Sequence, residues 1–355
     1  MDLKKSFSLP LLRWYQKHRR TLPWRSSRNP YHILVSEIML QQTQVDTVIP
    51  YYRQFLKAFP SFQHLSRAPI ERVLKLWEGL GYYARARNLH SLAQTVSRDH
   101  DGKLPDRGLG DLPGIGPYTE GAVRSIAFHQ DYAVVDGNVQ RVLARFFGLR
   151  QDPRSPAGRK KLWELAETLV PQGQAGDYNQ AVMDLGAMIC TPHLPRCSRC
   201  PVEKTCTARR LNWVHLIPTR KKSRRLPHDP IGAGVIWKGG KILIGQRPFQ
   251  GLLGGLWEFP GGKQKRGETL PECIRREIQE ELGVRVQVGR KLAKVKHAYS
   301  HFKITLHVYS CRYLSGTPRA LGCRAWRWVA PGELKRFAFP AANQPIIRKL
   351  LIEKK

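Results

Sequence analysis

Four of the seven cysteines lie in one short segment with the spacing C-x6-C-x2-C-x5-C, namely Cys190, Cys197, Cys200 and Cys206. Thiolates this close in sequence can converge on one centre, and four of them suit either a zinc ion or an iron–sulfur cluster. A disulfide framework would spread its cysteines along the chain. The grouping therefore favours a metal centre in a reducing compartment.

Glu37 is a carboxylate inside an apolar stripe. Its neighbours at helical spacing are Ile33, Leu34 and Leu40. Burial on such a stripe raises the pKa of a carboxyl group and makes a proton donor available near neutral pH. The residue is therefore either a general acid or a buried carboxylate paired with an arginine.

Asp136 immediately precedes a stretch with helical periodicity, 139–146, so it lies close to a helix N-terminus. Capping that helix is the structural interpretation, and the helix dipole favours the ionised carboxylate. A carboxylate held in its ionised form can also stabilise positive charge that develops during a reaction. Asp136 is a candidate for this electrostatic role.

The charge of the chain predicts a polyanionic partner. Lys and Arg number 60 against 27 Asp and Glu, a formal net charge of +33. Nucleic acid is the expected partner, because neutralising phosphates releases counterions. The glycines Gly114 and Gly116 in LPGIGPYT leave backbone N–H groups uncovered at a helix start, which suits a phosphate. No apolar run is long enough for a membrane span and no signal peptide is evident, so we expect an intracellular protein. A monomer is the default expectation for its oligomeric state.

Two periodicities divide the 355 residues into two domains. Apolar residues recur every three or four positions over 31–211, which predicts an all-α region. A basic, proline-punctuated stretch typical of a linker follows. Beyond it the period becomes two, and one helix over about 270–282 ends at Gly283, which predicts an α+β domain. We place the helical domain at 1–207, the linker at 208–230 and the second domain at 231–355.

These features together resemble the endonuclease III and MutY superfamily of DNA glycosylases. The cysteine segment 190–206 matches its [4Fe–4S] loop, the glycine hairpin at 108–128 its helix-hairpin-helix, and SEIMLQQTQV the MutY family itself. The resemblance implies a multidomain protein whose all-α helix-hairpin-helix domain carries a [4Fe–4S] cluster. It also implies a location in the cytoplasm or nucleoid and double-stranded DNA as partner.

The resemblance assigns roles to single residues. Glu37 becomes the acid that protonates adenine, Asp136 the stabilising anion and Asn138 a supporting polar contact. In relatives that also cut the strand, a lysine able to form a Schiff base occupies the position of Tyr118, so we expect water as nucleophile and an abasic site as product. Flipping of the base and contacts to DNA fall by resemblance to Arg20, Trp24, Arg25, Leu40, Gln42, Tyr82, Gly114 and Gly116.

Residues 231–355 resemble a Nudix fold, which in MutY proteins recognises 8-oxoguanine. Most relatives have lost the Nudix hydrolase signature, whereas here Gly262, Glu268 and REIQEELGV at 276–284 complete it. One helical face then presents three carboxylates suited to Mg²⁺, those of Glu277, Glu280 and Glu281. The family's Phe-Ser-His run at the lesion corresponds to YSH at 299–301, which makes Ser300 and His301 expected contacts.

The resemblance therefore implies a monofunctional DNA glycosylase that removes adenine opposite 8-oxoguanine or guanine in base excision repair. The alternative is an additional or principal Nudix hydrolase activity on oxidised nucleotides such as 8-oxo-dGTP. A DNA-binding protein without catalysis is disfavoured, because it would not need Glu37 in an apolar stripe.

Overall fold

The computed structural model of the chain describes residues 3–219 and 226–352, so residues 220–225 of the expected linker lie outside it. The chain divides into two compact units. One comprises Met1–Arg67 with Ser91–Ser223, and the other comprises Ala68–His90 with Arg224–Lys355. No helix in the described part is both long and apolar enough to cross a membrane.

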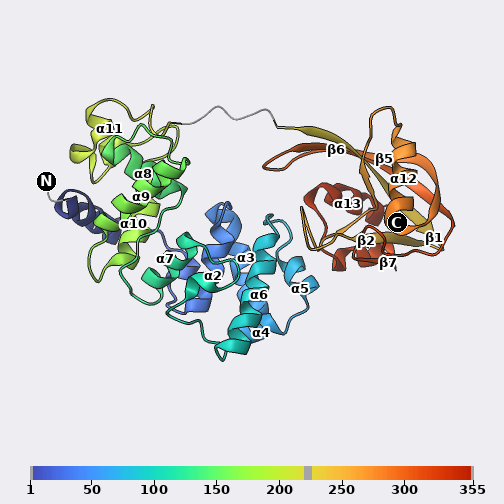
Figure 1. Cartoon of the computed structure of the whole chain (residues 1–355), viewed down its shortest axis with the longest axis horizontal. Helices are drawn as coiled ribbons and strands as arrows, with labels where there is room; N and C mark the ends of the chain where they lie inside the picture. The colour runs from blue at the N-terminus through green and yellow to red at the C-terminus, as the bar shows by residue number, and fades with distance from the viewer. Residues whose placement is uncertain (1–2, 220–225, 353–355) are drawn as a thin grey trace. The chain divides into compact units, whose positions relative to one another are not determined.

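The residues before the linker form helices, as the periodicity predicts (Figure 1). Several start where the sequence supplies a cap: the side chains of Asn29, Asp136 and Ser155 accept backbone N–H bonds at the beginnings of their helices. The helices are α1 Leu9–His18, α2 Pro30–Leu40, α3 Val45–Ala58, α4 Phe62–Ser66, α5 Ile70–Leu76, α6 Ala84–Asp99, α7 Pro117–Ile126, α8 Gly137–Phe147, α9 Pro156–Leu169, α10 Ala175–Met188 and α11 Thr207–Arg210.

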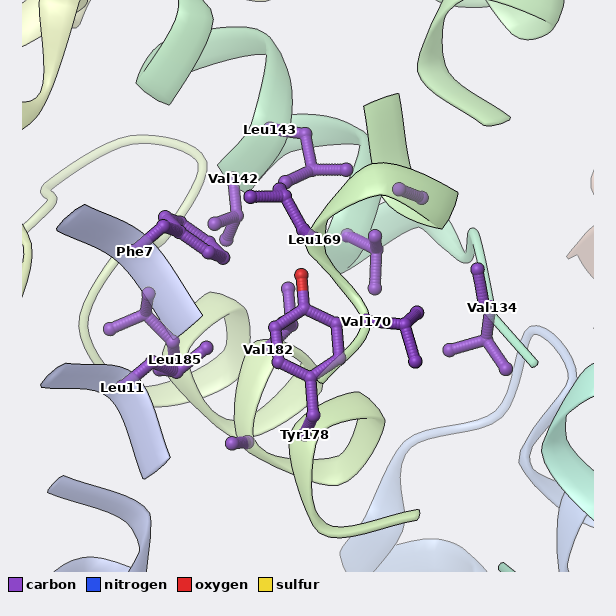
Figure 2. Packing of buried hydrophobic residues seen from close by; sticks show 14 of the residues in the cluster. Phe7, Leu11, Val134, Val142, Leu143, Leu169, Val170, Tyr178, Val182 and Leu185 are labelled. Atoms are coloured by element: carbon purple, nitrogen blue, oxygen red, sulfur yellow. The ribbon is translucent and has the colours of Figure 1, made fainter. Parts of the chain in front are cut away.

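The core of the first unit forms around α10, which contacts α1, α7 and α8. Figure 2 shows Tyr178 and Leu185 of α10 packed among side chains from the N-terminal helices and from α8. Phe7 lies edge-on to Phe146 with ring centroids 4.5 Å apart, a geometry that adds about 1 kcal/mol to burial alone. This packing fixes the helices that carry the pocket described below.

The second unit is built on one seven-stranded sheet, which confirms the α+β prediction. The main path runs β3-β2-β1-β6-β5; β4 also pairs with β1, and β7 with β2. β1 and β6 are parallel, whereas the other pairs are antiparallel. The strands are β1 His228–Lys238, β2 Lys241–Gln246, β3 Trp257–Glu258, β4 Gly261–Lys263, β5 Arg285–Ala298, β6 Lys303–Ser315 and β7 Ala325–Val329.

Helix α12, Leu270–Leu282, has the predicted bounds and ends at Gly283, whose φ of 68° is the left-handed value that favours glycine. Its apolar residues pack on the sheet where β1 carries Gly232 and Gly234. A Cβ at either glycine would lie 2.9 Å from an isoleucine of α12, so the close approach requires glycine. The helix α13, Gln344–Ile352, belongs to a second apolar cluster that also contains residues of β1, β2 and β6.

Segment 68–90 belongs to the second unit, which the sequence did not predict. Glu78 accepts hydrogen bonds from Phe339 N at 2.7 Å and from Gln344 Nε2 at 2.8 Å. Arg87 donates to the carbonyl of Gly254 at 2.7 Å. The helical half of the sequence therefore contributes one segment to the unit that holds the sheet.

Candidate active site

A cavity of about 140 Å³ in the first unit collects most of the residues expected to act on a base. Its walls come from α2, the start of α3 and the turn before it, α7, α8, α10 and the segment before α2. Eight of the expected residues line it, namely Glu37, Asp136, Tyr118, Asn138, Arg20, Trp24, Arg25 and Leu40. The remaining wall residues, which the sequence analysis did not assign to the site, are Leu22, Ile33, Ser36, Thr43, Val45, Ile126, Gln180 and Met183.

Glu37 lies in α2 and is 4% exposed. Burial raises the pKa of its carboxyl group to about 7, while the hydroxyl of Tyr118, which donates to Glu37 Oε2 at 2.6 Å, lowers that pKa. Asp136 adds a smaller effect that raises the pKa of Glu37. Burial prevails, so a substantial fraction of this group carries a proton near neutral pH.

Asp136 caps α8 and also faces the cavity. Its Oδ1 accepts the backbone N–H of Val139 at 2.7 Å and its Oδ2 accepts from Asn138 Nδ2 at 3.0 Å. Burial raises the pKa of Asp136 above the usual aspartate value, and these hydrogen bonds act in the opposite direction. The sequence argument considered only the helix terminus and therefore missed the larger effect of burial.

The orientation of Asn138 is fixed from two sides. Arg141 Nη2 donates to Asn138 Oδ1 at 2.8 Å, which directs the amide nitrogen toward Asp136. Gly186 of α10 lies against the other side, because a Cβ at this position would be 2.6 Å from Asn138 Cβ. The start of α8 is thus held by its neighbours and by its own cap.

Two of the expected base contacts share one buried carboxylate. Asp184, which is fully buried, accepts Arg20 Nη2 at 2.6 Å and Arg25 Nη1 at 2.7 Å. The Nε of Arg20 and the Nη2 of Arg25 donate to the same carboxylate. The aspartate orients both guanidinium groups at the wall of the cavity.

Sequence analysis missed Asp184, although the signal that identified Glu37 is present there too. Asp184 lies between the buried residues Val182 and Leu185 on α10. A carboxylate in an apolar stripe requires a partner, and here the partners are 159 and 164 positions away in sequence. The stripe could have identified the residue, but it could not have identified the two arginines.

Gln42 and Tyr82 lie outside this cavity and share an unusual backbone. Their φ values are 58° and 48°, in the left-handed region that non-glycine residues rarely adopt. Such a conformation costs about 1 to 3 kcal/mol and persists where the surrounding structure imposes it. In the second unit, Tyr82 Oη is hydrogen-bonded to Ser300 Oγ. Tyr82 and Ser300, both expected to contact the strand that carries the lesion, are therefore neighbours although 218 positions separate them in sequence.

The glycine hairpin has the expected form. Gly114 has a φ of 77°, and Gly116 is the N-cap residue of α7 with Pro117 at the first helical position. A Cβ on Gly116 would meet nothing within 4 Å. Gly116 is itself exposed, so its backbone amide is accessible to an anion. His301, the other expected lesion contact, is exposed at the turn between β5 and β6.

The four clustered cysteines line a separate cavity of about 30 Å³ in the first unit. Arg145 of α8 donates to Cys190 Sγ at 3.3 Å and to the carbonyl of Thr191 at 2.7 Å. Arg141 of the same helix donates to the carbonyl of Cys190 at 2.7 Å. The helix that starts at Asp136 thus also anchors the cysteine loop.

The predicted Mg²⁺ site on α12 finds no support. Arg276 Nη1 donates to Glu277 at 2.7 Å and to Glu280 at 3.1 Å. Glu281 accepts the amide of Gly261, and burial raises the pKa of Glu281 to about 8, which disfavours its charged form. No group of three or more His, Cys, Asp or Glu side chains in the described part of the chain is arranged around a single ion. We derive no step through Mg²⁺.

Comparison with known proteins identifies both halves. Residues 35–168 match the model of the HhH-GPD superfamily of base excision DNA repair proteins, and residues 232–349 match the NUDIX domain. A thermostable thymine-DNA glycosylase has a similar structure, with a TM-score of 0.55 and 37% identity over 59% of this chain and 97% of that one. Endonuclease III in a trapped covalent complex with DNA shares the fold, with a TM-score of 0.50 and 20% identity over 59% of this chain and 95% of its own.

Relatives that match most of the chain carry one name. The human adenine DNA glycosylase is 37% identical over 97% of this chain and 73% of its own length. The enzyme of Schizosaccharomyces pombe is 32% identical over 93% of this chain and 86% of its own. Both alignments extend well beyond the helical region, so they include the sheet domain. The chain therefore belongs to the adenine DNA glycosylase family, with a helix-hairpin-helix domain followed by a Nudix domain.

Proposed function

We propose that this protein hydrolytically removes adenine mispaired with 8-oxoguanine or guanine in duplex DNA. The observation that carries the proposal is the cavity in which a protonatable Glu37 faces Asp136, with Tyr118 hydrogen-bonded to the glutamate. Adenine leaves poorly as an anion, so its departure needs a proton. The sugar left behind is cationic in character and needs a nearby negative charge.

Glu37 supplies the proton. Its raised pKa keeps a proton available near neutral pH. Arg20, Trp24 and Leu40 form walls of the same cavity and receive the flipped adenine. Base flipping is required because the glycosidic bond cannot be attacked inside the duplex.

Asp136 supplies the negative charge beneath the sugar. Its two hydrogen-bond donors, Val139 N and Asn138 Nδ2, hold the carboxylate in place and favour its charged form against the effect of burial. As positive charge develops on the sugar, the ionised aspartate gains a partner, so its electrostatic stabilisation is largest in the transition state.

Water is the nucleophile. Tyr118 occupies the hairpin position at which the strand-cutting relatives carry a lysine, and burial raises the pKa of its phenol well above the usual value. A neutral phenol cannot form a Schiff base with the sugar. The product is then an intact strand with an abasic site.

The cysteine loop holds a [4Fe–4S] cluster in this proposal. The support is a cavity lined by all four cysteines, with the guanidinium of Arg145 against Cys190. Each thiolate binds a different iron of such a cluster, so the four sulfurs need not surround one point as the ligands of a zinc ion do. When bound, the cluster cross-links the loop and so shapes a basic surface that includes Arg196 and Arg199.

The lesion is read by the second unit. Ser300 and His301 lie at the turn between β5 and β6, and Ser300 bonds to Tyr82, which intercalates beside the 8-oxoguanine. Hydrogen-bonding groups held in this way can discriminate a base that offers a matching partner from one that does not.

A strand-cleavage assay tests this function. A duplex labelled on the adenine strand, with adenine opposite 8-oxoguanine, is expected to break only after incubation with protein followed by alkali. Breakage without alkali would contradict the role of water, and an intact strand after both treatments would contradict base removal. The cluster is tested by iron content, which is expected at four per chain and to fall in Cys200→Ser, whereas zinc in its place would reject the cluster.

A further inference from the structure

The strands of the second unit carry positive charge that neither the pocket nor the turn at Ser300 uses. The sequence contains no Asp or Glu between Glu281 and Glu333, so β5 and β6 hold no carboxylate. Lys294 and Lys296 of β5 and Lys303 of β6 are all exposed.

The strand register puts these lysines on one face of the sheet. Lys294 pairs with His307, and Lys296 with Thr305, across β5 and β6. On the other side of β6, Lys303 pairs with His228 of β1. Residues that pair directly share a face, and so do residues two apart on one strand. We call Lys294, Lys296, Lys303, His228 and His307 the basic face.

A hollow of about 380 Å³ opens at one end of the basic face. Its lining includes Lys296, Lys303 and His228, and none of the described residues that line it is acidic. His228 Nε2 lies 2.9 Å from the hydroxyl of Thr305, which holds this imidazole against the sheet. The hollow therefore offers cationic donors and no carboxylate to compete with an anion.

Like charges on adjacent strands oppose one another. Neighbouring side chains of the same charge destabilise a sheet. Burial is the main cause that lowers the pKa of His307, and the positive charges of Lys291 and Lys294 lower that pKa further. Nearby carboxylates are already engaged: Asp229 pairs with Lys263 at 2.7 Å. The acidic residues of α12 bond to Arg276, Thr269 and the amide of Gly261.

Protection of an exposed sheet edge does not explain this pattern. Lysines on an edge strand prevent pairing with another chain, and β5 is such an edge. However, Lys303 belongs to β6 and is paired at this residue with β5 on one side and with β1 on the other. Charge on inner strands serves no purpose in edge protection, so an external anion is the better explanation.

We propose that the basic face binds the phosphate backbone of duplex DNA, outside the base-flipping pocket. Residues two apart on a strand are separated by about 6.6 to 6.8 Å, which is about twice the 3.4 Å rise between phosphates of one DNA strand. Lys294 and Lys296 therefore match the repeat of a phosphate backbone. The inference rests on the proposed function, since the duplex is the same substrate. It adds a second binding surface beyond the turn that carries Ser300 and His301.

The test is the salt dependence of DNA binding by the full-length protein. The logarithm of the DNA association constant K falls linearly with the logarithm of the salt concentration. The double variant Lys296→Gln/Lys303→Gln should make this negative slope shallower by about 1.8, because each lost phosphate contact removes about 0.9. The same relation predicts roughly thirtyfold weaker binding at 0.15 M salt. The loss should be equal for a plain duplex and for one with adenine opposite 8-oxoguanine, because phosphate contacts carry no sequence information.

A matched control is Lys241→Gln/Lys335→Gln, which removes the same charge from exposed positions of the same unit. An equal slope change in this control, no change in the test variant, or an effect confined to the lesion duplex would overturn the inference. Strand cleavage at low salt separates the two proposals. If the wild-type protein does not make the adenine strand cleavable by alkali, the proposed function is wrong. If the slopes of log K against log salt still change as expected in that case, the proposal that the basic face binds DNA is supported independently.

Discussion

Replacing Asp184 by asparagine tests the ion-pair cluster that orients Arg20 and Arg25. The substitution keeps the shape of the side chain and removes its charge, so two guanidinium groups lose their carboxylate. Removing one partner of a buried ion pair costs about 3 to 5 kcal/mol. Because the side chains of Arg20 and Arg25 are 28% and 12% exposed, water can replace part of the lost interaction, and we expect the lower end, about 3 kcal/mol.

For a folding unit of this size, a loss of about 3 kcal/mol lowers the unfolding midpoint by roughly 6 to 12 °C. Circular dichroism at a helix-sensitive wavelength measures this midpoint, because the first unit supplies most of the helix. The control is Asp99→Asn, whose partner Arg98 is an exposed neighbour, and it should leave the midpoint unchanged. If the unfolding midpoint of Asp184→Asn fell by less than about 2 °C, the reasoning would be refuted, because the two arginines would then not depend on this carboxylate.

The remaining predictions concern the chemistry. The single-turnover rate of base removal should be highest at low pH and should fall as the pH rises through about 7, because the acid is the protonated form of Glu37. Tyr118→Phe should move this fall to higher pH, since it removes the hydrogen bond that lowers the pKa of Glu37; a shift to lower pH would be inconsistent with that bond. Gly186→Ala should slow base removal by tenfold or more, a barrier increase of about 1.4 kcal/mol, because its Cβ would displace Asn138. Gly332→Ala serves as its control, because nothing lies within 4 Å of a Cβ there and this residue lies outside the cavity.

Much of the fold followed from local sequence signals. The start of α8 at Asp136 and the end of α12 at Gly283 were expected, because a capping side chain and a left-handed glycine act over a few residues. Glu37 and the four cysteines were also identifiable, since an apolar stripe and a close spacing can be read from the chain alone.

What the sequence could not give are contacts between distant segments. Asp184 lies 164 positions from Arg20, and Tyr118 lies 81 positions from Glu37. No periodicity encodes such pairs, because each depends on how helices pack against one another. The membership of segment 68–90 in the second unit was missed for the same reason. The net pKa shift of Asp136 also depends on burial by other helices, and the helix terminus alone indicated only the weaker effect.

The central claim is that Glu37 donates the proton that releases adenine, and release of free adenine from a duplex with adenine opposite 8-oxoguanine tests it most directly. The wild-type protein should release one adenine per duplex, and Glu37→Gln, which preserves the shape of the side chain without its acid, should release none while binding the duplex as tightly. Release by the variant at a rate near that of the wild type would contradict the account.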